Sequence, residues 1–132
     1  MIRQIQTHFL SGNMKSYIIT ESQLGNIAYR FVLDKLNNME FKFKKYKEFS
    51  FFPKDVNRAD HGIEADWVKG EGFDILVGNH FWRTVQDMFG LTDEQVKDAF
   101  RKAFVQKGIT KISEITSLDF SKFNDMIVNN VF

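Results

Sequence analysis

The stretch between residues 40 and 52 alternates aromatic and basic side chains in a pattern that could bind nucleic acid. Phe41-Lys42-Phe43-Lys44 alternates strictly, so a strand would place both rings on one face and both lysines on the other. Lysines contact phosphates, and aromatic rings stack on bases in proteins that bind single strands. The same alternation is typical of an amphipathic strand that buries its phenylalanines and keeps its lysines in water, where they also protect a strand edge. The candidate nucleic-acid-binding residues are Lys42, Lys44, Lys45, Lys47 and Tyr46.

Acidic side chains gather in the next stretch, residues 59–78, where oxygen ligands could hold a hard metal ion. Glu64 and Asp66 are two residues apart on an expected strand and therefore point the same way, with His61 nearby in the sequence. A metal-dependent hydrolase built on this pair is the weaker alternative. Neither a His-x-x-x-His spacing nor an EF-hand loop accompanies the pair, and solvated carboxylates on a hairpin are far commoner. We therefore predict no metal site.

Reactive groups with a recognisable catalytic spacing are absent from the sequence. The chain has no cysteine, which excludes disulfides, thiolate metal sites and cysteine nucleophiles. His80 begins an expected helix, whose dipole would favour the neutral imidazole of a base, but any first helical turn can carry a histidine. The sequence contains no Gly-x-Ser-x-Gly elbow, phosphate-binding glycine loop or Ser-x-x-Lys. We expect no enzyme, no cofactor and no small-molecule substrate.

Aromatic residues are unusually frequent, with 15 Phe, 2 Trp and 3 Tyr among 132 residues. A core of this size can bury all of them or leave some exposed, and exposed rings dominate protein–protein contacts. Charge is also uneven: residues 40–58 carry six basic and three acidic side chains, and residues 59–78 carry one basic and five acidic. Opposite charges of this kind suit head-to-tail or isologous pairing of subunits. The candidate protein-binding residues are Phe41, Phe43, Phe51, Phe52 and Trp67.

These residues lie on a predicted hairpin and the strands before it. Residues 62–68 alternate, Gly70-Glu71-Gly72 turns the chain, and residues 73–77 form a short buried strand. A further strand at residues 48–52 ends at Pro53. Two helices follow the hairpin; the first stops at Gly90, and the second begins with a Thr92 and Gln95 capping box and ends before a left-handed Gly108. Their expected inner residues are Phe81, Trp82, Val85, Met88, Phe89, Val96, Ala99, Phe100, Ala103 and Phe104.

The two ends of the chain carry weaker patterns. Residues 2–10 favour a short amphipathic helix, and residues 1–13 form an N-terminal arm or extension. A strand at residues 17–19 precedes a helix that begins with a Thr20 and Gln23 capping box and continues to about residue 36. One helical turn is expected around residues 113–115 and a last helix from about residue 121. The expected inner residues of the 20–36 helix are Leu24, Ile27, Ala28, Phe31, Val32 and Leu36.

One segment resembles a known group of proteins. Residues 14–24, Met-Lys-Ser-Tyr-Ile-Ile-Thr-Glu-Ser-Gln-Leu, are similar to the opening of many small uncharacterised proteins encoded by tailed bacteriophages, which begin Met-Lys-x-x-Ile-x-Thr-Glu-Ser-Gln-Leu. The resemblance implies a viral origin. It carries no catalytic residue and implies no activity.

Together these patterns predict an α+β fold: residues 14–132 form a single domain in which a small, mostly antiparallel sheet of three to five strands packs against three to five helices. The formal net charge is +1, which provides no global field for nucleic acid. No apolar run approaches the length of a membrane helix, and the N-terminus does not resemble a signal peptide, so we expect the host cytoplasm or a virion. The function we expect is protein–protein interaction or assembly without catalysis, plausible for a phage-encoded, virion-associated or host-directed protein. Nucleic-acid binding by the strand at 41–47 is the alternative.

Overall fold

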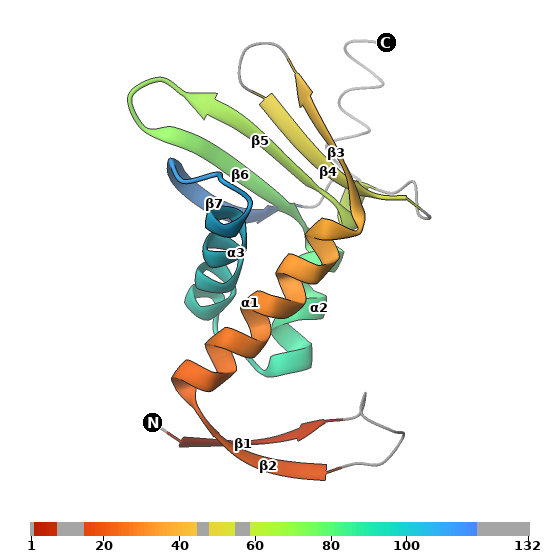
Figure 1. Cartoon of the computed structure of the whole chain (residues 1–132), viewed down its shortest axis with the longest axis vertical. Helices are drawn as coiled ribbons and strands as arrows, with labels where there is room; N and C mark the ends of the chain where they lie inside the picture. The colour runs from red at the N-terminus through yellow and green to blue at the C-terminus, as the bar shows by residue number, and fades with distance from the viewer. Residues whose placement is uncertain (1, 8–14, 45–47, 55–58, 119–132) are drawn as a thin grey trace.

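The computed structural model describes residues 2–7, 15–44, 48–54 and 59–118, and it confirms the predicted α+β fold (Figure 1). A five-stranded sheet forms one end of the molecule, three helices lie beneath it, and a two-stranded sheet lies at the opposite end. The helices are α1 (Glu21–Asn37), α2 (Asn79–Phe89) and α3 (Asp93–Gln106), with a 3-10 turn η1 (Ala59–His61). The strands are β1 (Ile2–Thr7), β2 (Lys15–Thr20), β3 (Met39–Lys44), β4 (Glu48–Pro53), β5 (Ile63–Val68), β6 (Gly72–Gly78) and β7 (Ile112–Leu118).

The large sheet is ordered β3-β4-β5-β6-β7, so each strand neighbours the next one in the chain. The first four strands form an antiparallel meander that includes the predicted hairpin, and β7 then pairs parallel to β6 after the α2–α3 crossover. The helical turn expected around residues 113–115 is wrong, because this segment belongs to β7. A register shift between Phe73 and Asp74 inserts one extra residue into β7, so Ile112 and Ile115 both pair along the inward-facing row although they are three apart. Three-residue spacing of apolar residues imitates a helix.

The amphipathic helix expected at residues 2–10 is also wrong. Residues 2–7 form β1, which pairs antiparallel with β2 along its whole length, from Ile2 opposite Thr20 to Thr7 opposite Lys15. A short isolated helix is marginal in water, whereas pairing with β2 satisfies the backbone hydrogen bonds of both segments. The described part of the predicted arm, residues 2–7, therefore pairs with a strand of the same chain. The last predicted helix, from residue 121, lies outside the described residues.

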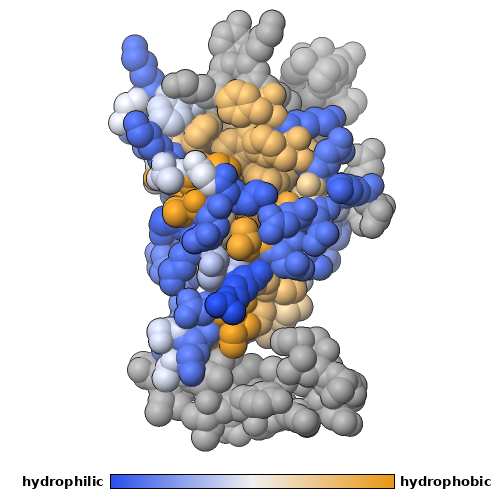
Figure 2. Space-filling view, in the orientation of Figure 1, coloured by the Kyte–Doolittle hydropathy of each residue, from blue (hydrophilic) through white to orange (hydrophobic). Residues whose placement is uncertain are grey.

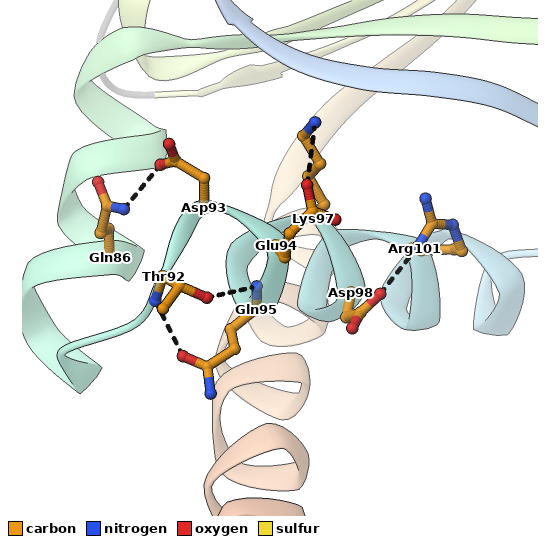
Figure 3. A network of polar contacts seen from close by, with 8 residues as sticks. All are labelled: Gln86, Thr92, Asp93, Glu94, Gln95, Lys97, Asp98 and Arg101. Atoms are coloured by element: carbon orange, nitrogen blue, oxygen red, sulfur yellow. Dashed lines mark hydrogen bonds and ion pairs between the residues drawn. The ribbon is translucent and has the colours of Figure 1, made fainter.

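Capping boxes begin both long helices, as predicted. The Thr92 side chain accepts a hydrogen bond from the Gln95 backbone N–H at 3.2 Å, and the Gln95 side chain accepts one from the Thr92 N–H at 2.8 Å (Figure 3). Thr20 and Gln23 make the same pair of bonds at the start of α1. The Gln95 amide also donates to a carboxylate oxygen of Glu21 at 2.6 Å, which ties the first turns of α1 and α3 together. Gly108 adopts the expected left-handed conformation, with φ of 87°. Gly90, where the first helix was expected to stop, is also left-handed, with φ of 62°.

The core lies between the helices and the sheet. On α1 the fully buried residues recur every four positions, at Leu24, Ala28, Val32 and Leu36, so the inner stripe is narrower than predicted. Ile27, which was expected inside, is 43% exposed because it lies beside this stripe. The predicted inner residues of α2 and α3 are buried, except Met88, which is half-buried against the core. Among the described residues, no helix combines the length and the apolar character needed to cross a membrane.

Candidate functional site: an exposed aromatic edge strand

Strand β3 forms one edge of the sheet and carries two rings that the helices do not cover. Within the described part of the chain, β3 pairs only with β4, which places Phe41 opposite Phe51 and Phe43 opposite Phe49. The α3 residue Phe104 packs on Phe49 and Phe51, with ring centroids 6.3 and 6.2 Å apart. Helix α3 therefore covers β4, and the rings of the next strand outward remain 49% (Phe41) and 63% (Phe43) exposed.

Figure 2 shows an apolar area over the sheet, above the helices and bordered by hydrophilic residues. The Phe41 ring is anchored against two core rings of β4, because its centroid lies 4.9 Å from that of Phe51 and 5.9 Å from that of Phe49. A ring held from below and open from above can contact a partner at little entropic cost, since its rotamer is already restricted. Such rigid aromatic groups are typical anchors of protein interfaces.

The other three predicted protein-binding residues are not equivalent to these two. Phe51 is 1% exposed, so the expectation of an exposed ring is wrong at this position: it is part of the core beneath α3. Phe52 points to the opposite face of the sheet and is half-buried against Gly62, where an added Cβ would lie 2.6 Å from its ring. Trp67 is half-buried, with its ring 5.1 Å from that of Phe73.

Lys42 lies on the face opposite the rings, as the alternation predicts, and Lys44 occupies the next alternate position of the strand. Lys42 pairs in register with Ser50 on β4, which in turn pairs with Glu64 on β5. Lys44 pairs with Glu48 on β4, which in turn pairs with Asp66 on β5. The phosphate-binding and base-stacking groups of the nucleic-acid hypothesis are therefore on different faces. Lys45, Tyr46 and Lys47 lie outside the described residues.

Carboxylates form a row across the lysine-bearing face of the sheet. Glu48, Asp66, Asp74 and Glu114 occupy successive paired positions on β4 to β7. No three Asp, Glu or His side chains converge to hold a metal ion within the ranges that the structure describes. The row gives this face a negative charge beside the two lysine positions at its β3 edge.

The two histidines considered in the sequence analysis lie side by side, which the sequence analysis did not predict. The ring centroids of His61 and His80 are 4.0 Å apart, and His61 Nε2 lies 3.9 Å from a carboxylate oxygen of Asp60. The predicted hairpin could have indicated this contact. The two ends of a hairpin meet, and His61 directly precedes this hairpin while His80 follows it closely. The Gly78 N–H donates to the Gly62 carbonyl at 2.8 Å and closes these ends.

Comparison of the chain with protein-family models, with curated proteins and with solved structures gave no match.

Proposed function

We propose that this protein acts by protein–protein interaction, without catalysis, and that β3 is its contact strand. The observation that supports this most strongly is the exposure of Phe41 and Phe43 on an edge strand. Edge strands are usually protected by charge, proline or a covering element. Here the charges are confined to one face, and the other face presents apolar rings beside backbone groups that pair with no other described strand. Such an edge can extend its sheet by adding a strand from a partner.

The partner we propose is a second copy of the chain, paired antiparallel through β3 about a two-fold axis at Phe41. In this register Phe41 meets Phe41, and Met39 of each copy meets Phe43 of the other on the ring-bearing face. On the opposite face Glu40 meets Lys42 of the second copy, and symmetry repeats this pair. Cross-strand apolar and opposite-charge pairs each contribute roughly 0.2–1 kcal/mol.

The neighbouring register is less favourable for an electrostatic reason. If the axis passes through Lys42, this lysine faces its own copy, and like charges directly opposite each other destabilise a sheet. Charge therefore selects the Phe41-centred register. The similarity of residues 14–24 to tailed-phage proteins supports a role for this assembly in a virion or an infected host cell.

The test is the solution mass, measured by light scattering after size exclusion over a range of concentrations and at low and high salt. We expect a dimer of the wild type, and the double variant Phe41→Ser, Phe43→Ser should raise its dissociation constant by at least about thirtyfold, the effect of one strong interface residue. Val105→Ser is the matched control, because Val105 is 45% exposed on α3, away from β3. A monomeric wild type at every concentration, or an equally strong dimer of the double variant, would contradict the proposal.

The register has its own test by charge exchange. Glu40→Lys and Lys42→Glu should each weaken the dimer, since each places like charges opposite one another in the Phe41-centred register. The double exchange restores both pairs and should restore the wild-type dissociation constant. A double exchange that is weaker than either single variant would exclude this register.

Nucleic-acid binding remains a second candidate because Phe41 and Phe43 are exposed, which a base-stacking surface requires. Its lysines, however, lie on the opposite face among carboxylates. If it is correct, single-stranded oligonucleotides should bind with an affinity that falls steeply with salt, and Lys42→Glu should reduce it. Binding that is insensitive to salt would reject this mechanism.

A further inference from the structure

A separate cavity lies at the end of the sheet where the histidines meet. Because β3 and β4 are antiparallel, with Met39 opposite Pro53, the start of β3 and the end of β4 are neighbours. The last turns of α1, the turn η1 and the first turns of α2 approach the same place. The resulting cavity has a volume of about 320 Å³. It is lined by Phe31, Lys35, Asn38, Met39, Pro53, Lys54, His61, His80, Phe81 and Thr84.

We propose that this cavity binds a small organic phosphate monoester, with the phosphate held by its basic side chains and an apolar or aromatic group held by its walls. This proposal does not rest on dimer formation through β3, although Met39 belongs to both surfaces.

The charges that line the cavity favour an anion. Its described lining contains two lysines, Lys35 and Lys54, and the imidazoles of His61 and His80, and none of the described lining residues is a carboxylate. Neither lysine takes part in an ion pair among the residues that the structure describes. A phosphate dianion accepts several charge-assisted hydrogen bonds, which ammonium and imidazole groups from different elements can donate together.

Lys35 is directed along the cavity wall by an aromatic contact. Its ammonium nitrogen lies 5.3 Å from the centroid of the Phe31 ring, close enough for a cation–π interaction that restricts the side chain. Two described acidic groups lie beside the cavity rather than in its lining: Asp60 contacts His61, and Asp87 belongs to the adjoining hollow that His80 also lines. Lys35, Lys54 and His80 therefore make no ion pair among the described residues and can contact a ligand.

The remaining lining is apolar and favours a ligand with an organic group. Phe31, Met39, Pro53 and Phe81 provide the walls, and Phe81 is only 5% exposed. A volume of about 320 Å³ is near the lower end for small-molecule sites, which suits one ring and its phosphate. An inorganic phosphate would leave these apolar walls without a partner.

The test uses phenyl phosphate as the probe, with inorganic phosphate and phenol as separate controls, measured by titration calorimetry and by backbone amide shifts in NMR. We expect saturable binding of phenyl phosphate at low salt, at least about tenfold tighter than either control, with shifts centred on Thr84 and Phe31. Equal affinities for phenyl phosphate and inorganic phosphate would overturn the assignment, as would an absence of saturable binding.

Substitutions of lining residues then test which side chains hold the phosphate. Lys35→Ala and His80→Gln change exposed side chains, so both should fold, and each should weaken phenyl phosphate about tenfold, as loss of a charge-assisted bond does. Lys69→Ala is the matched control, because it removes an exposed lysine at the β5–β6 turn, away from the cavity. Unchanged affinity in both cavity variants, or an equal loss in the Lys69 variant, would show that the phosphate binds elsewhere.

Discussion

The β3 edge and the histidine cavity use the same strand in opposite ways. In the middle of β3, Phe41 and Phe43 project over a part of the sheet that none of the described helices covers, and they form an exposed apolar surface. At its start, Met39 lies beside the ends of α1 and α2, which enclose a hollow with basic side chains. In our proposals the exposed surface takes another protein strand, and the hollow takes a small anion. The two proposals differ because the described helices cover the two parts of β3 to different extents.

The largest expected effect is a difference in stability between variants of the buried phenylalanines of β4 and variants of the exposed phenylalanines of β3. Phe51→Ala should reduce the free energy of unfolding by about 3–5 kcal/mol, because it opens a cavity under Phe104. Phe41→Ala removes a half-exposed ring and should cost less than about 1.5 kcal/mol, yet it should weaken the dimer strongly. Urea unfolding of both variants measures the difference. Equal losses of stability would mean that Phe41 is covered and that the edge surface does not exist.

An intermediate effect is expected at Gly62, which lies between the cavity and the sheet. Gly62→Ala would place a Cβ 2.7 Å from the Phe51 carbonyl oxygen and 2.6 Å from the Phe52 ring, and relief of this clash should cost about 1–3 kcal/mol. The shift would displace the adjacent His61, so phenyl phosphate binding should weaken more than dimer formation.

Gly25→Ala is the matched control for this glycine substitution. Among the described residues beyond the helix's own backbone and the two chain neighbours, the added Cβ meets only the end of the Lys102 side chain, at 3.9 Å. The change should therefore stabilise α1 by about 0.5–1 kcal/mol. Thermal unfolding compares the two variants. If they had effects of the same sign, the close packing around Gly62 would not control stability.

The smallest expected effect is at the start of α3. Thr92→Ala removes the side-chain cap and should cost about 1 kcal/mol, whereas Thr92→Ser keeps an acceptor and should cost less. Neither variant should change dimer formation or phenyl phosphate binding, since the α3 cap touches neither surface. Loss of either binding activity in Thr92→Ala would show that the two regions depend on helix docking more than their local contacts indicate.

Features that depend on neighbouring residues could be predicted from the sequence. The capping boxes at Thr20 and Thr92, the helix end at Gly90, the left-handed Gly108 and the 62–77 hairpin all involve contacts within a few residues or across one turn. Strands β1 and β7 could not be predicted in this way. Their pairing partners, β2 and β6, determine their conformation, and the extra residue in β7 hides its alternation.

The candidate sites depend still more on contacts between distant segments. Alternation correctly placed the rings and lysines of β3 on opposite faces, but it could not show which rings are exposed. The cavity brings together residues from 31 to 84, and only the pairing of Gly62 with Gly78 brings His61 to His80.

Phe41 and Phe51 show which properties follow from the sequence and which depend on the tertiary structure. The sequence by itself determined that each lies on an amphipathic strand with its ring on the apolar face, because that follows from the two-residue repeat. Only the tertiary structure decided that Phe51 is 1% exposed and Phe41 49% exposed, although they face each other in register. The physical reason is the position of α3, whose Phe104 covers β4 and leaves β3 open to solvent.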